Sequence, residues 1–364
     1  MPDSHMPDSH MIASRATRHQ VRRRMAATTP VLLALLLLVF VVAVVTFGDR
    51  ASARMASETL IRVTLVAGFW IFVGNSGVVS FGHAAFACVG AYVSAWTTVA
   101  PAMKATLLPG LPALLADARW HVLPASVAAG LAAALLALVT GAAILRLSGI
   151  AASIATFAFL AMVNTIWANW TPVTGGTSSV VGLERYVTPW VGLGWAVATL
   201  AAAGLYAASA SGLALRASRE DEVASSASGI DRYRHRLAAY TISAFFCGVG
   251  GALMGHYIGV INPDGFYLNL TFLMLAMLVV GGIGSLSGAV VGVLAVSLAV
   301  DALVRMEKGV SIGDVTFALP PGSQEILIAA AMILVLIFRP AGLLAGREIT
   351  LPARWVAGRG ASND

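Results

Sequence analysis

The sequence predicts an all-α protein that crosses a membrane about ten times, with its N- and C-termini in the cytoplasm. Hydrophobic residues make up 58 % of the chain and charged residues 11 %, whereas a soluble domain averages roughly 25 % charged residues. Apolar runs recur along the chain at lengths that fit membrane spans. The Lys and Arg residues gather between alternate runs, which is typical of a multi-pass protein of the cell (inner or plasma) membrane.

Ten apolar runs are expected to form a membrane domain over residues 30–338. The first, Pro30–Phe47, follows a basic tail (residues 1–29) and fits either a retained helix or a cleaved signal segment. A second tail is expected over residues 339–364. The other nine runs are Thr59–Gly74, Val79–Ala100, Val122–Leu145, Ile150–Trp170, Thr188–Ala208, Leu237–Ile258, Leu268–Gly282, Ser287–Ala302 and Ile326–Phe338.

The distribution of basic residues predicts the orientation. If the N-terminus lies inside, the inner segments hold fifteen of the 23 Lys and Arg residues and the outer segments hold eight. An excess of Lys and Arg marks the cytoplasmic side. Both tails and the charged insert at residues 211–236 are therefore expected in the cytoplasm.

The charged insert, SGLALRASREDEVASSASGIDRYRHR, is expected to contain one short helix with both ends specified. Ser218 and Asp221 fit the S-x-x-D/E capping pattern, and Gly229 is expected to follow the last turn. The acidic residues Glu220, Asp221 and Glu222 would lie in the first turn, where the helix dipole favours them. A narrow apolar stripe is formed by Val223, Ala224, Ala227 and Ile230. A helix this short must pack against another surface to be stable.

Two Gly/Ser-rich interruptions, at residues 74–83 and 281–288, each separate two apolar runs. Irregular backbone at membrane depth must be buried in protein or line an aqueous cavity, and in transporters it often marks the solute path. An ordinary tight turn is an equally good interpretation, and for His83 a structural hydrogen bond is favoured. The candidate solute-path residues are Asn75, Ser76, Ser80, Phe81, His83, Gly281, Gly282 and Ser285.

Small residues spaced by four are expected where helices pack closely. They are Gly284, Gly288 and Gly292, the pair Ala244 and Gly248, and the pair Gly251 and Gly255. Such rows let two helix backbones approach each other within a membrane.

The sequence predicts that the protein is not an enzyme and that it binds neither a cofactor nor a metal. There is no H-E-x-x-H motif. A P-loop requires Gly-Lys-Ser/Thr, but the two lysines, Lys104 and Lys308, follow Met and Glu. Ionisable residues are scarce deep in the spans, which counts against an ion-coupled carrier. The basic residues form no surface stripe, so nucleic acid is not an expected partner.

Eight segments resemble the LivM-type permeases of branched-chain amino acid ABC importers, in the order found in that family. They are NSGVVSFGHAAFACVGAY at Asn75–Tyr92, LRLSGI at Leu145–Ile150, TGG at Thr174–Gly176, SGLALRASREDEVASSASGI at Ser211–Ile230, AAYTISAF at Ala238–Phe245, NPDGF at Asn262–Phe266, GGIGSLSGAVVG at Gly281–Gly292 and FRPAGLL at Phe338–Leu344. Together they extend over most of the predicted membrane domain.

This resemblance implies a permease subunit that works in membrane lipid with a second related permease, two cytoplasmic ATPases and a periplasmic or lipid-anchored solute-binding protein. The insert would be the loop that docks on the ATPases. Its apolar stripe would fill a groove, and Arg219, Glu220, Asp221 and Glu222 would orient it. The implied solute is a branched-chain or other hydrophobic amino acid, with urea or a short amide as the alternative. A stand-alone secondary transporter or channel is the rival from another class.

Overall fold

The structure is a computed structural model that describes residues 9–307, 310–312, 315–317, 320, 322–339 and 341–350. Helices account for nearly all of its regular structure. Two antiparallel strand pairs complete it: β1 (Val180–Val181) with β2 (Val260–Ile261), and β3 (Val310–Ile312) with β4 (Val315–Phe317).

The long helices coincide with the ten predicted spans. They are α1 (Ser9–Phe47), α2 (Arg50–Ser76), α3 (His83–Thr98), α6 (Val122–Ile144), α7 (Gly149–Asn169), α9 (Pro189–Ala208), α12 (Arg232–Ile258), α13 (Leu268–Gly281), α14 (Leu286–Glu307) and α15 (Ser323–Phe338). The shorter helices are α4 (Pro101–Leu107), α5 (Ala113–Ala116), α8 (Thr171–Thr174), α10 (Ala210–Glu220), α11 (Glu222–Ala227) and the 3₁₀ turn η1 (Asp264–Phe266).

Eight helical segments in the described part of the chain are long and apolar enough to cross a membrane, and one of them, Asp264–Gly281, combines η1 with α13. The other two predicted spans, α3 and α15, are helices of 16 residues each. Both are shorter than the roughly 20 residues that a perpendicular crossing needs. The chain is a multi-pass, all-α membrane protein.

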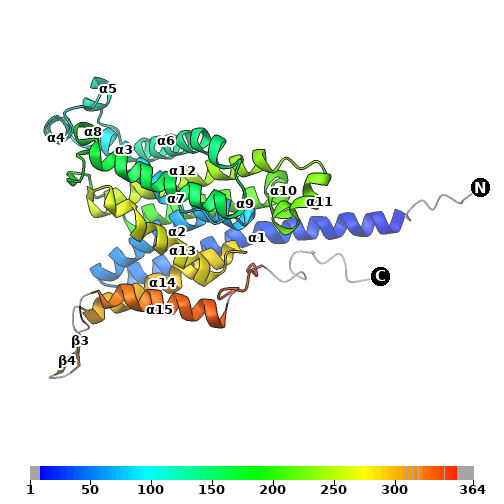
Figure 1. The fold of residues 1–364 in the computed structure, drawn as a ribbon. Helices are drawn as coiled ribbons and strands as arrows, with labels where there is room; N and C mark the ends of the chain where they lie inside the picture. Colours follow the sequence, from blue (N-terminus) through cyan, green and yellow to red (C-terminus); the bar gives the residue numbers. More distant parts are fainter. Residues whose placement is uncertain are drawn as a thin grey trace, which may run out of the picture.

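The centre of the bundle is formed by α2, α3 and α12 (Figure 1). α12 packs on α2, α3 and α6, and α9 covers another side of α2. α2 is almost wholly buried, whereas α1 lies at the edge with most of its span exposed. Exposed apolar side chains on outer helices such as α1, α6 and α7 suit contact with lipid.

Glycines bring two helix pairs into close contact. A Cβ on Gly251 of α12 would lie 1.9 Å from the carbonyl oxygen of Ala87 on α3. A Cβ on Gly292 of α14 would lie 1.9 Å from the carbonyl oxygen of Met277 on α13. Any larger side chain would force these backbones apart, so the small-residue rows mark helix contacts as predicted.

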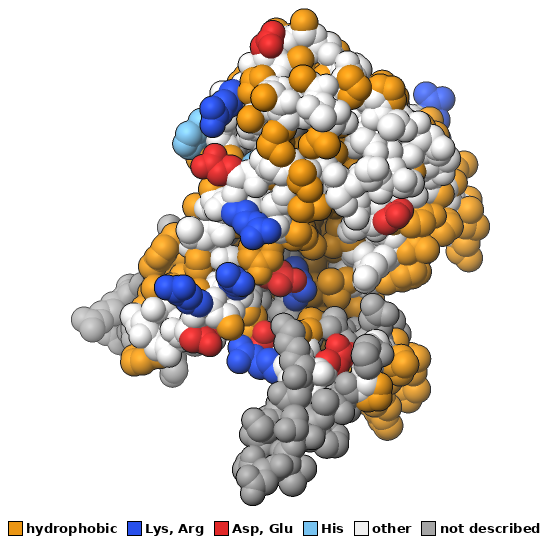
Figure 2. Space-filling model, turned by 90° about the vertical axis from the view of Figure 1, so that its left-hand side faces the viewer, with side chains coloured by type: hydrophobic (Ala, Val, Ile, Leu, Met, Phe, Trp, Pro, Cys, Tyr) orange, Lys and Arg blue, Asp and Glu red, His pale blue; other side chains and the backbone are white. Residues whose placement is uncertain are grey.

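Different segments lie at the two ends of the bundle (Figure 1). The start of α1, the α10–α11 pair and the segment after α15 lie at one end, and α4, α5, α8 and the β3–β4 hairpin lie at the other. This matches the predicted alternation of the spans. Acidic and basic side chains are spread over the second end, with hydrophobic side chains along its flanks (Figure 2).

One lysine organises the loops at that second end. Lys104 of α4 is buried, and its Nζ donates to the carbonyl oxygens of Trp96 (2.9 Å), Leu115 (2.6 Å) and Ala118 (2.6 Å). Burial lowers the pKa of Lys104, and the nearby carboxylate of Asp117 opposes this shift. The lysine thereby connects the end of α3 with the loop around α5.

The predicted N-terminal tail is not separate from the first span. Residues 9–29 continue α1 without a break, so the described part of the tail is helical. Residues 339 and 341–350 follow α15 and pack against the bundle, as described below. Residues 1–8 and 351–364 lie outside the described residues.

Candidate functional site

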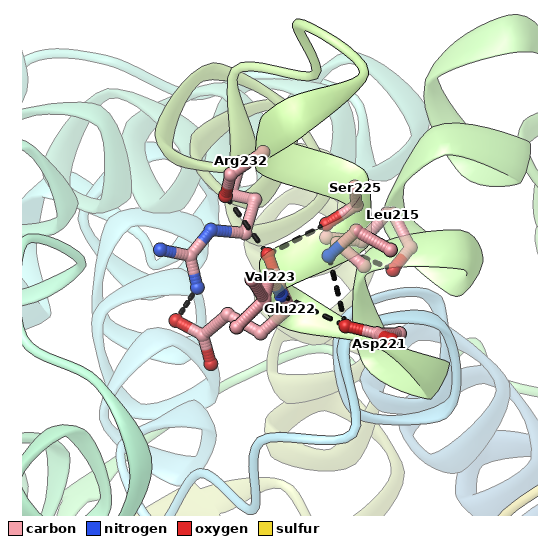
Figure 3. Close-up of polar contacts among 9 residues, drawn as sticks. Leu215, Asp221, Glu222, Val223, Ser225 and Arg232 are labelled. Atoms are coloured by element: carbon pink, nitrogen blue, oxygen red, sulfur yellow. Dashed lines mark hydrogen bonds and ion pairs between the residues drawn. The ribbon is translucent and has the colours of Figure 1, made fainter.

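The charged insert forms two short helices, α10 and α11, that meet at Asp221. This residue has an extended backbone, with φ −145° and ψ 109°, so the chain changes direction there. Its Oδ1 accepts hydrogen bonds from the backbone N–H groups of Val223 and Ala224, both at 2.9 Å (Figure 3). Asp221 is therefore the N-cap of α11 and satisfies two otherwise free donors of its first turn.

The prediction that Ser218 caps a single helix is wrong. Ser218 lies in the last turn of α10, where its hydroxyl donates to the carbonyl oxygen of Leu215 at 2.7 Å. Gly212, Leu215 and Ser218 recur every three residues and form the buried face of α10. Burial of that face extends α10 to Glu220. Only Glu222 of the three acidic residues then lies in the first turn of α11.

Gly229 follows the last turn of α11, as expected. Its φ of +79° is the left-handed conformation that glycine adopts without strain. The Gly229 N–H donates to the Ser226 carbonyl at 3.0 Å, and the Ile230 N–H donates to the Ser225 carbonyl at 3.1 Å. These two bonds form a Schellman motif. α11 is thus held at both ends despite its length of six residues.

One side of α11 is open and consists of small or apolar side chains. Val223 is 79 % exposed, and Ala224 and Ala227 are also exposed. We refer to these three residues as the α11 face. Ser225 is buried against the bundle, and Ile230 lies past the helix end and is partly buried. The exposed stripe therefore has three members and not the four that were predicted.

Charged residues flank the α11 face. Glu222 forms an ion pair with Arg232 at the start of α12, which ties α11 to a membrane-spanning helix (Figure 3). The side chain of Glu220 is 81 % exposed. Burial lowers the pKa of Arg216, a residue of α10. The carboxylate of Glu348 opposes this shift, and the positive charge of Arg219 adds to it.

Arg219 reaches from α10 to the end of α2. Its Nη1 donates to the carbonyl oxygen of Gly74 at 2.8 Å. The side chain also lies against Gly77, where a Cβ would be only 2.8 Å from Arg219 Cγ. The structure thus brings the insert into contact with the first Gly/Ser-rich interruption, which the sequence places more than 140 residues away.

That interruption is a compact turn whose backbone is bonded to side chains. α2 ends at Gly77, with φ +70°, and α3 begins at His83. Three backbone N–H groups donate to hydroxyls: Val78 to Ser76 (3.2 Å), Gly82 to Ser80 (3.3 Å) and Phe81 to Thr156 of α7 (3.1 Å). Buried Asn75 donates its Nδ2–H to the Ile71 carbonyl at 2.9 Å. These bonds satisfy donors that water cannot reach.

His83 is buried at the base of this turn. Its Nδ1 lies 2.9 Å from the hydroxyl of Ser80. Its ring is surrounded by Phe69, Phe72, Phe86 and Tyr240, with centroid distances of 4.8, 5.6, 5.8 and 5.2 Å. His83 therefore packs helices α2, α3 and α12 together.

The second interruption joins α13 to α14 and is buried by close backbone packing. A Cβ on Gly281 would lie 1.8 Å from the Gly288 carbonyl oxygen, and Gly282 has a φ of +116°. The Ser285 hydroxyl accepts from the Gly288 N–H at 3.0 Å. Trp70 of α2 donates its indole N–H to the Ile283 carbonyl at 3.0 Å, so both interruptions contact the last turns of α2.

Glu348 supports the second interruption, and no motif in the sequence predicted this role. Its carboxylate accepts from the N–H groups of Leu286 (2.7 Å) and Ser287 (3.0 Å) and from the Ser287 hydroxyl (2.7 Å). It thereby caps α14 from 61 and 62 residues away. The same segment donates from Leu343 N–H to the Val280 carbonyl at 2.8 Å. A cap so distant in sequence follows no local pattern.

The described residues contain no cluster of three or more His, Cys, Asp or Glu side chains that could hold a metal. Cys88 and Cys247 are buried and free. The chemistry of the site is therefore that of packing, backbone hydrogen bonds and ion pairs.

The family described as branched-chain amino acid transport system / permease component matches residues 51–336. This match extends from the start of α2 to the end of α15. The chain belongs to the branched-chain amino acid permease family of ABC transporters. The insert, both interruptions and the helices that hold them all lie within the part that matches this permease family.

Individual relatives agree with the family. The permease protein LivM of a high-affinity branched-chain amino acid transport system in Escherichia coli K12 is 28 % identical, over 85 % of this chain and 73 % of LivM. LivH of the same organism is 36 % identical over 38 % of this chain and 41 % of its own length. BraD of Pseudomonas aeruginosa is 33 % identical over the same shares. No solved structure matches significantly.

Proposed function

We propose that this chain is the membrane-spanning subunit of an ABC importer that moves branched-chain amino acids into the cytoplasm, using ATP hydrolysed by two separate ATPases. The observation that carries the proposal is the α11 face. It combines small exposed side chains with a helix that is capped at both ends and ion-paired to α12. Such a face can enter a groove on a partner without losing much conformational entropy.

The remaining partners follow from the two ends of the bundle. The ATPases would dock at the end that carries α11, and the excess of basic residues supports a cytoplasmic location for this end. A solute-binding protein would meet the opposite, charged end (Figure 2). A second related permease would complete the path, because the two interruptions are tightly packed within this one subunit. The candidate solute-path residues remain predictions.

The relatives' names support branched-chain amino acids as the solute over urea or a short amide. The paired LivM and LivH names in one organism also support a permease partner. A stand-alone carrier gains no support from a match to this permease family.

Co-purification of the ATPases with the full-length chain tests the proposal. Ala224→Glu and Ala227→Glu should abolish co-purification, because each buries an unpaired carboxylate in a contact made by small side chains. Ala217→Glu, at an exposed alanine of α10, is the matched control and should retain the ATPases. Equal retention by all three variants would refute docking through the α11 face.

Transport in liposomes separates the two classes of transporter. Uptake of a branched-chain amino acid should require the ATPases, the solute-binding protein and ATP together. Uptake driven by an ion or solute gradient in liposomes that contain this chain alone would refute the importer.

A further inference from the structure

An open cavity of about 460 Å³ is lined by residues at the end of α6, at the start of α7, at the end of α11 and in the turn between α11 and α12. Three arginines line it, Arg146, Arg232 and Arg236, together with Ser148, Ser226 and Tyr233. Its volume is many times the roughly 30 Å³ that one water molecule occupies in the liquid. The cavity can therefore hold a polar group much larger than water.

The positive charge in this cavity is only partly neutralised. Arg232 pairs with Glu222, and the one acidic residue of the lining, Asp231, pairs through Oδ2 with Nε of Arg234 at 3.0 Å. Arg146 and Arg236 take part in none of the ion pairs among the described residues. Arg146 instead lies over the ring of Tyr233, with Cζ 6.0 Å from its centroid.

Arg236 lines the cavity with incomplete hydrogen bonding. It is only 8 % exposed, and its buried Nε has no hydrogen-bond partner in the described part of the chain. A buried N–H donor without an acceptor is unfavourable, and an unpaired positive charge beside it adds to the cost. An anion in the cavity would supply both an acceptor and a counter-charge to Arg236.

The geometry of the donors favours a phosphate. Guanidinium groups donate to phosphate oxygens in pairs, and several arginines around one anion are typical of phosphate recognition. The hydroxyl of Ser148, which makes no capping bond to α7, adds a further donor at the cavity wall. We infer that this cavity binds a phosphate group through Arg146 and Arg236, and that the group is the headgroup phosphate of an anionic phospholipid.

The surroundings of the cavity favour a lipid as the source. Directly beside it, the start of the membrane-spanning helix α7 exposes Ile150 (79 %) and Ile154 (63 %), and Leu147 before it is 44 % exposed. A phospholipid whose phosphate occupies the cavity can lay its acyl chains along these side chains. Because lipid surrounds these side chains, phospholipid headgroups lie within reach of the cavity.

Occupancy of the cavity has a consequence for α11. Ser226 of α11 and Ile230 just after it form part of the cavity wall. A bound phosphate would thus help to fix the position of α11 relative to α6, α7 and α12. This inference concerns a lipid site and does not depend on whether the α11 face docks on ATPases.

Native mass spectrometry of the full-length chain tests the site. The protein is purified from membranes and reconstituted in nanodiscs of phosphatidylcholine with phosphatidylglycerol, and lipid retained after release into detergent is counted. The wild type should retain phosphatidylglycerol in preference to phosphatidylcholine. Arg146→Gln and Arg236→Gln should each weaken this retention about tenfold, because each loses a charged hydrogen bond. Arg119→Gln changes the net charge equally at an exposed residue after α5, at the other end of the bundle, and should behave as the wild type.

A second measurement separates lipid from soluble phosphate. Inorganic phosphate is titrated calorimetrically into the delipidated protein. The melting temperature of each variant is recorded to confirm that it is folded. Arg146 is exposed, so its replacement should not disturb the core. Phosphate binding that Arg146→Gln abolishes, without selective lipid retention, would support a phosphate site but overturn the lipid assignment. Identical behaviour of Arg146→Gln, Arg119→Gln and the wild type in both measurements would overturn the site itself.

Discussion

Arg219 Nη1 donates a hydrogen bond of 2.8 Å to the carbonyl oxygen of Gly74. This bond joins the α10–α11 pair to the last turn of α2, a helix that is largely buried in the bundle. Carbonyls at a helix C-terminus lack partners within the helix, and a guanidinium there also complements the helix dipole. We therefore expect a movement of the α10–α11 pair to be transmitted to α2 and to the turn that separates α2 from α3.

The first prediction concerns Arg219→Gln, which removes this link and leaves the α11 face unchanged. The ATPases should still co-purify, but the amino acid transported per ATP hydrolysed should fall by about two- to thirtyfold. Arg234→Gln is the control and should transport normally, since it removes the same charge from a side chain that is 82 % exposed and pairs with Asp231 instead of α2. Normal transport by Arg219→Gln in proteoliposomes would show that the bond does not carry the coupling.

The second prediction concerns the N-cap of α11. Asp221→Ala removes the acceptor of two backbone N–H groups and should destabilise the helix by about 1 kcal/mol. Hydrogen exchange at the amides of Val223 and Ala224 should then become faster by up to about tenfold, because local opening costs less free energy. Asp221→Asn keeps a side-chain oxygen at the same place and should retain most of the protection. Unchanged exchange in the alanine variant would contradict the capping role.

The third prediction concerns the cap that Glu348 provides to α14. Glu348→Ala leaves two backbone N–H groups and the Ser287 hydroxyl without their acceptor. We expect a loss of about 1 to 2 kcal/mol in local stability, because the carboxylate also faces the positive end of the helix dipole. Exchange at the amides of Leu286 and Ser287 should accelerate, with little change at the α11 amides. Glu348→Gln should lie between the alanine variant and the wild type, and equal exchange in all three would refute the cap.

The sequence by itself determined the class, the ten helices and the position of the charged insert between two of them. These follow from local signals, since the length and polarity of each apolar run depend on neighbouring residues alone. The glycine rows likewise marked helix contacts correctly, because a missing side chain is visible in sequence. Gly229 ended α11 as expected, because only glycine adopts that backbone conformation readily.

Tertiary structure decided which of several local options was used. Both Ser218 and Asp221 could have capped a helix, and burial of Ser218 on the inner face of α10 selected Asp221. The bond from Arg219 to Gly74 spans 145 residues, and those from Glu348 to α14 span up to 62 residues. No local sequence pattern predicts contacts over such separations. The unpaired charge of Arg236 is equally a product of folding. Whether a charged side chain finds a partner depends on how the helices pack, and composition alone does not specify that packing.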